Sequence, residues 1–329
     1  MFRKSLLCAS LLFVGCGQVE DTAFRDGLPS KETVELKSPG GTRGQGLKSG
    51  EVSAFGQGDT SEYYALTRGA TEVVNGGTAA VLTLIEEITE YPPTSITGEV
   101  AVWGPYSDAL KRNAWKLTVT QKAEHEYTYE LAGKAKEADD SAFKVILSGT
   151  HAIALDAQGN RLRNYGSGSL KIDWDAEQTL PEHGKDLGVA TIRYTRESAA
   201  TVATVEADFR NVKDDERPGT RVNADYRYKE TPGAGGEFDF ALDKNLDKPG
   251  TNRPGIEHIT VKSRWTQNGM GRSDVKVTGG DMGSNAGTVS DCWDSNFNSQ
   301  YLTLHLGITL GYGTVDACGS FSTPVYSLL

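Results

Sequence analysis

Three groups of residues in this chain have the types and spacing that can support chemistry. The first lies between Trp265 and Asp281, where a guanidinium and two carboxylates stand among four glycines. A tight loop could assemble a polar binding site there from Trp265, Arg272, Asp274 and Asp281. The alternative, which we favour, is a structural hairpin in which the arginine pairs with an aspartate and covers the tryptophan face.

The second group consists of Asp243, Asn245 and Asp247, whose side chains supply oxygen atoms at alternate positions. This spacing is typical of the start of a calcium-binding loop. An EF-hand would continue with glycine at its sixth position and glutamate at its twelfth, where this chain has Lys248 and Pro254. A solvated turn is therefore favoured, and another calcium geometry is the alternative.

The third group is a pair of cysteines, Cys292 and Cys318, which neither a CxxC spacing nor adjacent histidines mark as zinc ligands. In an oxidising compartment two such cysteines form a disulfide. The pattern predicts a bond that spans the strand expected at 301–310, with Trp293 packed near the bridge. Two free thiols, or half of a metal site, are the alternative.

Catalytic motifs are missing from the sequence. The histidines at 125, 151, 183, 258 and 305 are scattered, and there is no GxSxG, HExxH, Walker A loop or GxGxxG. We therefore expect no enzyme and no cofactor. The net charge of −10 becomes −12 once the two cations of the first fifteen residues are removed. Such a surface repels nucleic acid, which we exclude as a partner.

The first seventeen residues predict a secretory leader: two cations, Arg3 and Lys4, precede an apolar run over 6–14. Residues 13–16, Phe-Val-Gly-Cys, resemble the lipobox of bacterial lipoproteins, although Phe13 stands where leucine is usual. The resemblance implies that residues 1–15 are removed and that Cys16 is acylated. An ordinary signal peptide cleaved elsewhere is the alternative. Gly17, in place of the retention signal aspartate, implies the outer membrane, on its periplasmic face or at the cell surface.

The segment that follows, residues 16–59, is rich in Gly, Ser, Lys, Glu and Asp and has almost no apolar periodicity. It predicts a lipidated flexible tether. Within residues 62–91, apolar residues recur at three- and four-residue steps from Val81 to Ile88, and Pro92-Pro93 ends the pattern. Because Gly76-Gly77 interrupts it, we expect two short helices or one helix broken at the glycines.

The rest of the chain alternates apolar and polar residues in eleven runs, beginning with Trp115, Leu117 and Val119 and ending with Leu302, Leu304 and Leu306. Turn-forming residues separate the runs, with no helical pattern between them, so parallel strands are disfavoured. Residues 60–329 are therefore predicted to form one mainly β domain. We expect one large curved antiparallel meander, half-barrel or barrel-like, packed on one or two short N-terminal helices.

This layout resembles the half-barrels of bacterial lipoprotein carriers such as LolA. Segments 102–119, 263–282, 290–301 and 317–321 also resemble uncharacterised lipoproteins of myxobacteria-type bacteria, and this resemblance implies no particular activity. The expected function is a non-catalytic, outer-membrane-anchored module that binds an apolar or amphipathic ligand such as a lipid. The alternative is a structural or protein-interaction lipoprotein of the cell envelope, with a protein partner and no ligand.

Overall fold

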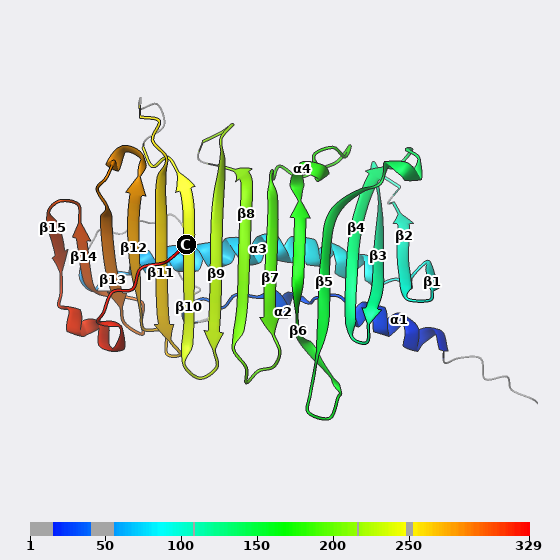
Figure 1. The fold of residues 1–329 in the computed structure, drawn as a ribbon, viewed down its shortest axis with the longest axis horizontal. Helices are drawn as coiled ribbons and strands as arrows, with labels where there is room; N and C mark the ends of the chain where they lie inside the picture. Colours follow the sequence, from blue (N-terminus) through cyan, green and yellow to red (C-terminus); the bar gives the residue numbers. More distant parts are fainter. Residues whose placement is uncertain (1–15, 41–55, 108, 216, 248–252) are drawn as a thin grey trace, which may run out of the picture.

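The computed structural model describes residues 16–40, 56–107, 109–215, 217–247 and 253–329, which contain one large sheet and several helices (Figure 1). The predicted leader, residues 1–15, lies outside this range. The α-helices are α1 (Cys16–Asp26), α2 (Lys31–Val34), α3 (Glu62–Thr89) and α4 (Trp174–Glu177). Short 3₁₀ helices are η2 (Asp140–Ala142), η3 (Gly280–Met282) and η4 (Val315–Phe321).

The sheet has fifteen strands in the described residues, and each strand pairs in antiparallel fashion with the next one along the chain. The predicted antiparallel meander is therefore confirmed, as one open sheet. The strands are β1 (Ser95–Thr97), β2 (Val100–Tyr106), β3 (Asn113–Ala123), β4 (Glu126–Ala135), β5 (Lys144–Leu155), β6 (Arg161–Asp173), β7 (Val189–Arg196), β8 (Ala203–Lys213), β9 (Arg221–Thr231), β10 (Gly235–Lys244), β11 (Glu257–Thr266), β12 (Gly271–Gly279), β13 (Gly287–Trp293), β14 (Ser299–His305) and β15 (Thr309–Tyr312).

Eleven of these strands were predicted, and β1, β2, β13 and β15 were not. The edge strands β1 and β15 are only three and four residues long and contain no buried residue. Strand β13 buries its last four residues in succession, which hides the period of two. Apolar and polar residues alternate along a strand that has one buried and one solvated face. A strand covered on both faces, or on neither, lacks this alternation and is not recognised by it.

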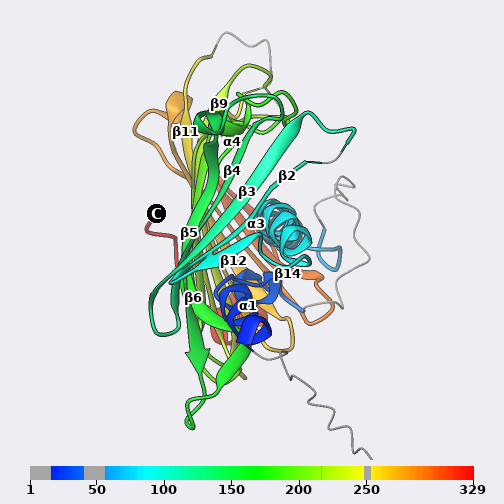
Figure 2. The ribbon, with the colours of Figure 1, turned by 90° about the vertical axis from the view of Figure 1, so that its right-hand side faces the viewer.

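The main hydrophobic core lies between one face of the sheet and the helices, and Figure 2 shows α3 and α1 on the same side of the sheet. We call this side the inner face. Alternate residues of the central strands point to it, as the period of two requires. They include Leu117, Tyr129, Leu170, Ile192 and Val205, all nearly inaccessible to solvent.

Helix α3 runs unbroken through Gly76 and Gly77 along most of the width of the sheet, so the expectation of short or broken helices is wrong (Figure 1). Each glycine costs about 1 kcal/mol relative to alanine in a helix. That cost is offset because α3 buries Val74, Leu82 and Ile85 against the sheet on both sides of the glycines. The predicted end is confirmed: α3 stops at Thr89, ahead of the two prolines.

The expected flexible tether is wrong for residues 21–40, which pack along the inner face. Phe24, Val34 and Leu36 are each at most 5% exposed. The side chain of Asn75 in α3 accepts from Leu36 N at 2.9 Å and donates to Leu36 O at 2.8 Å. The buried apolar residues of this segment do not recur with a regular period, and its backbone bonds to a side chain of α3. Composition alone therefore predicted a flexible segment. Residues 41–55 of the predicted tether lie outside the described range.

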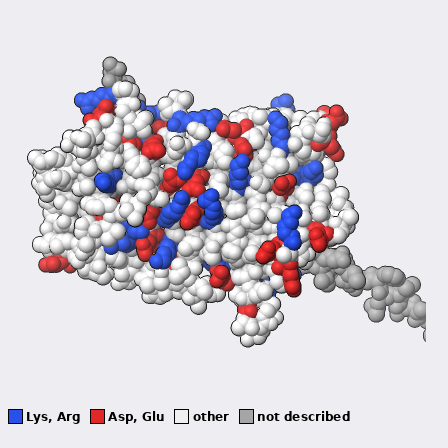
Figure 3. All heavy atoms as spheres, viewed as in Figure 1, with Lys and Arg blue, Asp and Glu red and all other residues white. Residues whose placement is uncertain are grey.

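The opposite, outer face of the sheet is charged, with cations and acids interspersed over its centre (Figure 3). Arg193 and Arg227 both pair with Asp208, at 2.9 and 2.7 Å. Lys262 pairs with Glu237 and Asp239 at 2.8 and 2.6 Å. Cross-strand pairs of opposite charge suit a solvated sheet face. Among the helices in the described residues, none combines the length and apolar character required to cross a membrane.

Candidate functional site

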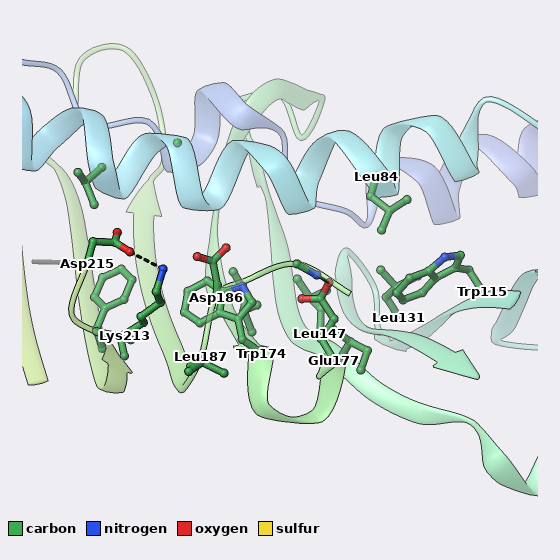
Figure 4. A pocket seen from close by; sticks show the side chains of 17 residues that line it. Leu84, Trp115, Leu131, Leu147, Trp174, Glu177, Asp186, Leu187, Lys213 and Asp215 are labelled. Carbon is green, nitrogen blue, oxygen red and sulfur yellow. Dashed lines mark hydrogen bonds and ion pairs between the residues drawn. The ribbon is translucent and has the colours of Figure 1, made fainter. Parts of the chain in front are cut away.

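Two adjoining cavities lie between α3 and the inner face of the sheet. One, of about 590 Å³, faces the middle of α3 and is shown in Figure 4. The other, of about 1060 Å³, lies at the C-terminal end of α3. Leu84 of α3, Trp115 of β3 and Glu177 of α4 line both cavities. The two cavities are therefore neighbours, and we call them together the groove.

The floor of the groove is apolar because it is built from inner-face positions of the strands. Leu131, Leu147, Ile172 and Phe209 line it from β4, β5, β6 and β8. Their neighbours on the same strands fill the core under α3, so the groove continues the core into solvent-accessible space. Leu131, Leu147 and Ile172 are at most 2% exposed and belong to the core. Trp115, Trp174 and Phe209 are half-buried, so they keep part of the apolar lining accessible, as in ligand sites.

The side of α3 that faces the groove has small or exposed apolar residues. Val73 lines the groove and is 65% exposed. Gly76 also lines the groove, and a Cβ atom added there would meet no atom within 4 Å. Gly76 is exposed, so the space beside it is open.

The loop between β6 and β7, residues 174–188, forms one wall of the groove. Hydrogen bonds within this loop fix its shape. Asp173 caps α4 by accepting from Ala176 N at 2.9 Å. Gln178 Nε2 donates to the carbonyl oxygens of Gly184 and Asp186 at 2.9 and 3.0 Å. Trp174, at the start of the loop, stacks on Phe209. This wall is therefore a defined surface that places polar groups beside the apolar floor.

The rim of the groove is charged. Glu177 and Asp186 come from the loop, and Figure 4 shows both beside the cavity, with Lys213 and Asp215 of the next wall close by. Lys213 pairs with Asp215 at 2.6 Å, and this hydrogen bond raises the pKa of the Lys213 ammonium. An apolar floor with a charged rim is suited to a molecule that has an apolar body and a polar end.

Residues that follow α3 hold the C-terminal end of the groove. Trp103 Nε1 donates to Tyr91 O at 2.9 Å, and Arg25 of α1 donates to the same oxygen at 3.1 Å. Tyr106 donates its hydroxyl to Pro92 O at 3.2 Å. Residues from α1, β2 and the segment after α3 therefore meet at this point and fix the position where the helix ends.

The polar site predicted between Trp265 and Asp281 is not assembled. Trp265 lies on the inner face, where it is buried near the ring of Tyr228. Arg272 and Asp274 lie on the outer face, and Asp281 lies in η3 at the end of the sheet. The polar site, which was the less favoured interpretation, is wrong. Arg272 pairs across the strands with Arg264, the neighbour of Trp265, so Arg272 and Trp265 point to opposite faces of the sheet.

The alternative interpretation of this segment is confirmed in part, because Arg272 and Asp274 form a buried ion pair at 2.7 Å. It is wrong that the arginine covers the tryptophan, which is on the other face. The C-terminal segment after η4 lies over the pair: Arg272 donates to the carbonyl oxygens of Phe321 and Ser322, and Asp274 accepts from Val325 N. These bonds give the pair a structural role.

The proposed calcium-loop start does not form a cation site. The guanidinium of Arg217 donates to Asn245 Oδ1 at 2.8 Å and also to the carbonyl oxygen of Asp247. Asp243 points elsewhere and lies 2.8 Å from His258 Nδ1. A positive side chain thus takes the oxygens that a metal would need, and the turn interpretation fits. Within the described ranges no cluster of three or more His, Cys, Asp or Glu side chains is placed to hold a metal.

The predicted disulfide between Cys292 and Cys318 is confirmed and joins β13 to η4. The prediction for Trp293 is wrong. Cys292 faces outward, under the C-terminal segment, whereas Trp293 faces inward, lies 5.9 Å from the ring of Tyr64 and donates to Gly269 O. Successive residues of a strand point to opposite faces, so a neighbour in sequence cannot shield the bond.

A buried titratable group lies in the same half of the sheet as the groove. His151 of β5 is 4% exposed, and its Nδ1 lies 3.0 Å from the hydroxyl of Tyr194. Burial lowers the pKa of His151 from 6.5 to about 4. Gly166 and Gly168 on β6 leave room for the two rings, since a Cβ atom at either would clash with them. His151 is therefore neutral at pH 7 and belongs to the core.

Sequence reasoning missed the groove although it identified some of its walls. Trp115 was placed on a strand by its alternation, but nothing in the pattern marks Glu177 or Asp186 as rim residues. The irregularity that the sequence shows in this region is Gly76-Gly77, which interrupts the apolar period of α3. Comparison of the chain with protein-family models, with curated proteins and with solved structures gives no significant match.

Proposed function

We propose that this protein is a non-catalytic binding module whose groove holds the apolar part of an amphipathic ligand. The observation that carries the proposal is the accessible apolar space between α3 and the inner face of the sheet. Ligand pockets are typically about 300–1,000 Å³. Taken separately, the two cavities of the groove, of about 590 and 1060 Å³, lie within and slightly above this range.

The energetics favour such a ligand. Each methylene moved from water into an apolar site contributes about 0.8 kcal/mol. A chain of ten methylenes would gain about 8 kcal/mol, from which the cost of immobilising the ligand, at least about 4 kcal/mol, is subtracted. The net gain is then at most about 4 kcal/mol, which corresponds to a dissociation constant of about 1 mM for a single chain of this length.

A matched pair of glycine substitutions tests the proposal. Gly76 and Gly69 both lie on α3 with no atom within 4 Å of an added Cβ, but only Gly76 lines the groove. We expect the uncharged probe N-phenyl-1-naphthylamine to fluoresce on binding to the wild-type protein. Gly76→Phe should weaken its affinity about tenfold or more, because the ring takes groove volume. Gly69→Phe should leave the affinity unchanged.

The proposal also predicts that the purified protein carries a bound lipid. Native mass spectrometry and solvent extraction should recover a bound lipid from wild type and less of it from Gly76→Phe. The proposal is abandoned if the probe does not bind and extraction recovers no lipid. Equal binding by wild type and Gly76→Phe would place the ligand elsewhere.

We also propose that the protein is anchored in the outer membrane by acylation of Cys16. The leader pattern of residues 1–16 supports this. Since residues 21–40 pack on the sheet, an acyl group at Cys16 would hold the domain close to the bilayer. Cys16→Ala should move the protein from the membrane fraction to the soluble fraction, and continued sedimentation with membranes would refute the anchor.

An interaction protein of the envelope is the second candidate, and the β14–β15 hairpin supports it. Leu306, Ile308 and Leu310 are each more than half exposed at the open edge of the sheet. Exposed apolar edge strands favour pairing with another chain. On this hypothesis Leu310→Lys would abolish co-purification of a defined envelope partner, and Gly76→Phe would not.

A further inference from the structure

Acidic side chains outnumber basic ones around the groove. Five acidic side chains line the two cavities, against two lysines and one histidine: Glu87, Glu177, Glu182, Asp186 and Asp215 against Lys111, Lys213 and His183. Lys213 is already paired with Asp215, so the balance around the apolar floor is negative. The apolar body of a ligand would lie among these groups.

Glu177 has a central position in this arrangement. It is the acidic residue that lines both cavities, and it is held by a hydrogen bond from Gly184 N to its Oε1 at 3.1 Å. Asp186 stands on the same loop, beside the cavity and next to Lys213 (Figure 4). Two carboxylates of a single rigid loop thus border the place where the head of an amphipath would emerge.

We propose that the groove selects amphipathic ligands with a cationic head group over those with an anionic head group. The inference rests on the proposed binding function and adds the charge class of its ligand. A carboxylate head would be repelled by Glu177 and Asp186, whereas an ammonium head would be attracted. Charges a few ångströms apart near a protein surface interact strongly enough to change an affinity about tenfold.

Three probes with the same twelve-carbon chain test the selection: dodecyltrimethylammonium, dodecyl maltoside and dodecanoate. Each is titrated below its micelle concentration against protein loaded with N-phenyl-1-naphthylamine. We expect the cation to displace the probe at about one tenth of the dodecanoate concentration at low ionic strength. Because salt screens exposed charges over about 10 Å at 0.1 M, the preference should shrink at high salt.

Two variants connect the preference to the loop. Glu177→Gln combined with Asp186→Asn removes both charges and keeps the side-chain sizes, and it should reduce the cation preference to about twofold or less. The matched control is Glu130→Gln. Glu130 is an exposed acid of β4 on the outer face, whereas its neighbour Leu131 lines the groove on the inner face. It should leave the preference unchanged. Thermal unfolding and maltoside displacement report whether each variant is folded.

The outcomes separate this inference from the proposed function. If none of the three detergents displaces the probe, or the probe itself does not bind, the binding function fails. If dodecyl maltoside binds but dodecanoate binds as tightly as the cation, the charge selection is wrong and the groove remains. A preference that survives in the double variant, or that does not change with salt, would also overturn the assignment to Glu177 and Asp186.

Discussion

The two ends of α3 meet the sheet in different ways. At its N-terminal end, Ser61 caps the helix and donates to Asp291 Oδ2 at 2.5 Å, and Thr67 lies 2.6 Å from the buried hydroxyl of Ser263. Tyr64 stacks on Phe297 at 4.3 Å between ring centroids. At the C-terminal end, Leu82, Ile85 and Ile88 are buried in apolar contacts, and the groove opens beside them.

The N-terminal end of α3 anchors the helix to the sheet, and the C-terminal end leaves room for a ligand. Buried hydrogen bonds hold a helix at one position, because each bond has a required length and direction. Apolar contacts are non-directional and tolerate a small displacement of the helix relative to the sheet. The polar end therefore fixes α3 on β11–β14, and the apolar end leaves space that a ligand can use.

The largest effect is expected at the polar end. Asp291 is 1% exposed and accepts from the hydroxyls of Ser61 and Ser299 at 2.5 and 2.6 Å. Asp291→Ala removes the acceptor to which both hydroxyls donate and should lower the free energy of unfolding by about 4 kcal/mol, measured by chemical denaturation. Amide hydrogen exchange should increase in the first turns of α3 more than in its last turns. Asp291→Asn, which keeps one acceptor, should lose less.

A loss below about 1 kcal/mol in Asp291→Ala would remove the basis for the comparison, since two buried charge-assisted hydrogen bonds are together expected to contribute more. The same conclusion would follow if exchange increased equally at both ends of α3.

The disulfide at the polar end should have the next largest effect. Cys292→Ser with Cys318→Ser opens a loop with a sequence separation of 26 residues. Chain entropy alone makes such a bond worth about 3.5 kcal/mol, so the melting temperature should fall by several degrees. Wild type in reductant should behave like the double variant. Recovery of both cysteines as alkylatable thiols from exported protein would contradict the bond.

The smallest of the three effects concerns His151, in the half of the sheet that contains the groove. Its pKa is about 4 in the folded state and 6.5 as the ordinary value. Between these values the unfolded chain binds a proton that the folded chain does not, so the free energy of unfolding should fall as the pH drops from about 6.5 to about 4. The total loss is roughly 3 kcal/mol.

His151→Gln replaces the imidazole with a side chain that does not titrate, and denaturation curves at pH 7 and pH 4.5 should then differ less than in wild type. An equal pH dependence in wild type and variant would show that other groups carry it. The experiment also tests the apolar end, because unfolding that begins there would expose His151 first.

Several features of the fold could be predicted from the sequence. The alternation in eleven of the fifteen strands is local, because side chains in a strand point to opposite faces residue by residue. The short turns between the runs imply antiparallel neighbours. The bond between Cys292 and Cys318 could be predicted because no CxxC spacing or adjacent histidine marks either cysteine as a metal ligand. The end of α3 could be placed because proline lacks the amide hydrogen that a helix needs.

The binding site could not be predicted in the same way. Trp265, Arg272 and Asp274 are close in sequence, yet pleating puts the tryptophan on one face and the ion pair on the other. The residues that do meet, Leu84, Trp115 and Glu177, are separated by tens of positions and belong to different elements. Their proximity depends on the path of α3 across the sheet.

The sequence by itself determined the class of fold, the strand order and the disulfide, since these follow from local periodicity, turn residues and the number of cysteines. Only the tertiary structure decided that residues 21–40 pack on the sheet, that α3 is continuous through Gly76, and that a groove remains beside it. The physical reason is that burial and empty space are properties of the gap between elements. That gap depends on how far apart the elements pack, which no single segment of the chain encodes.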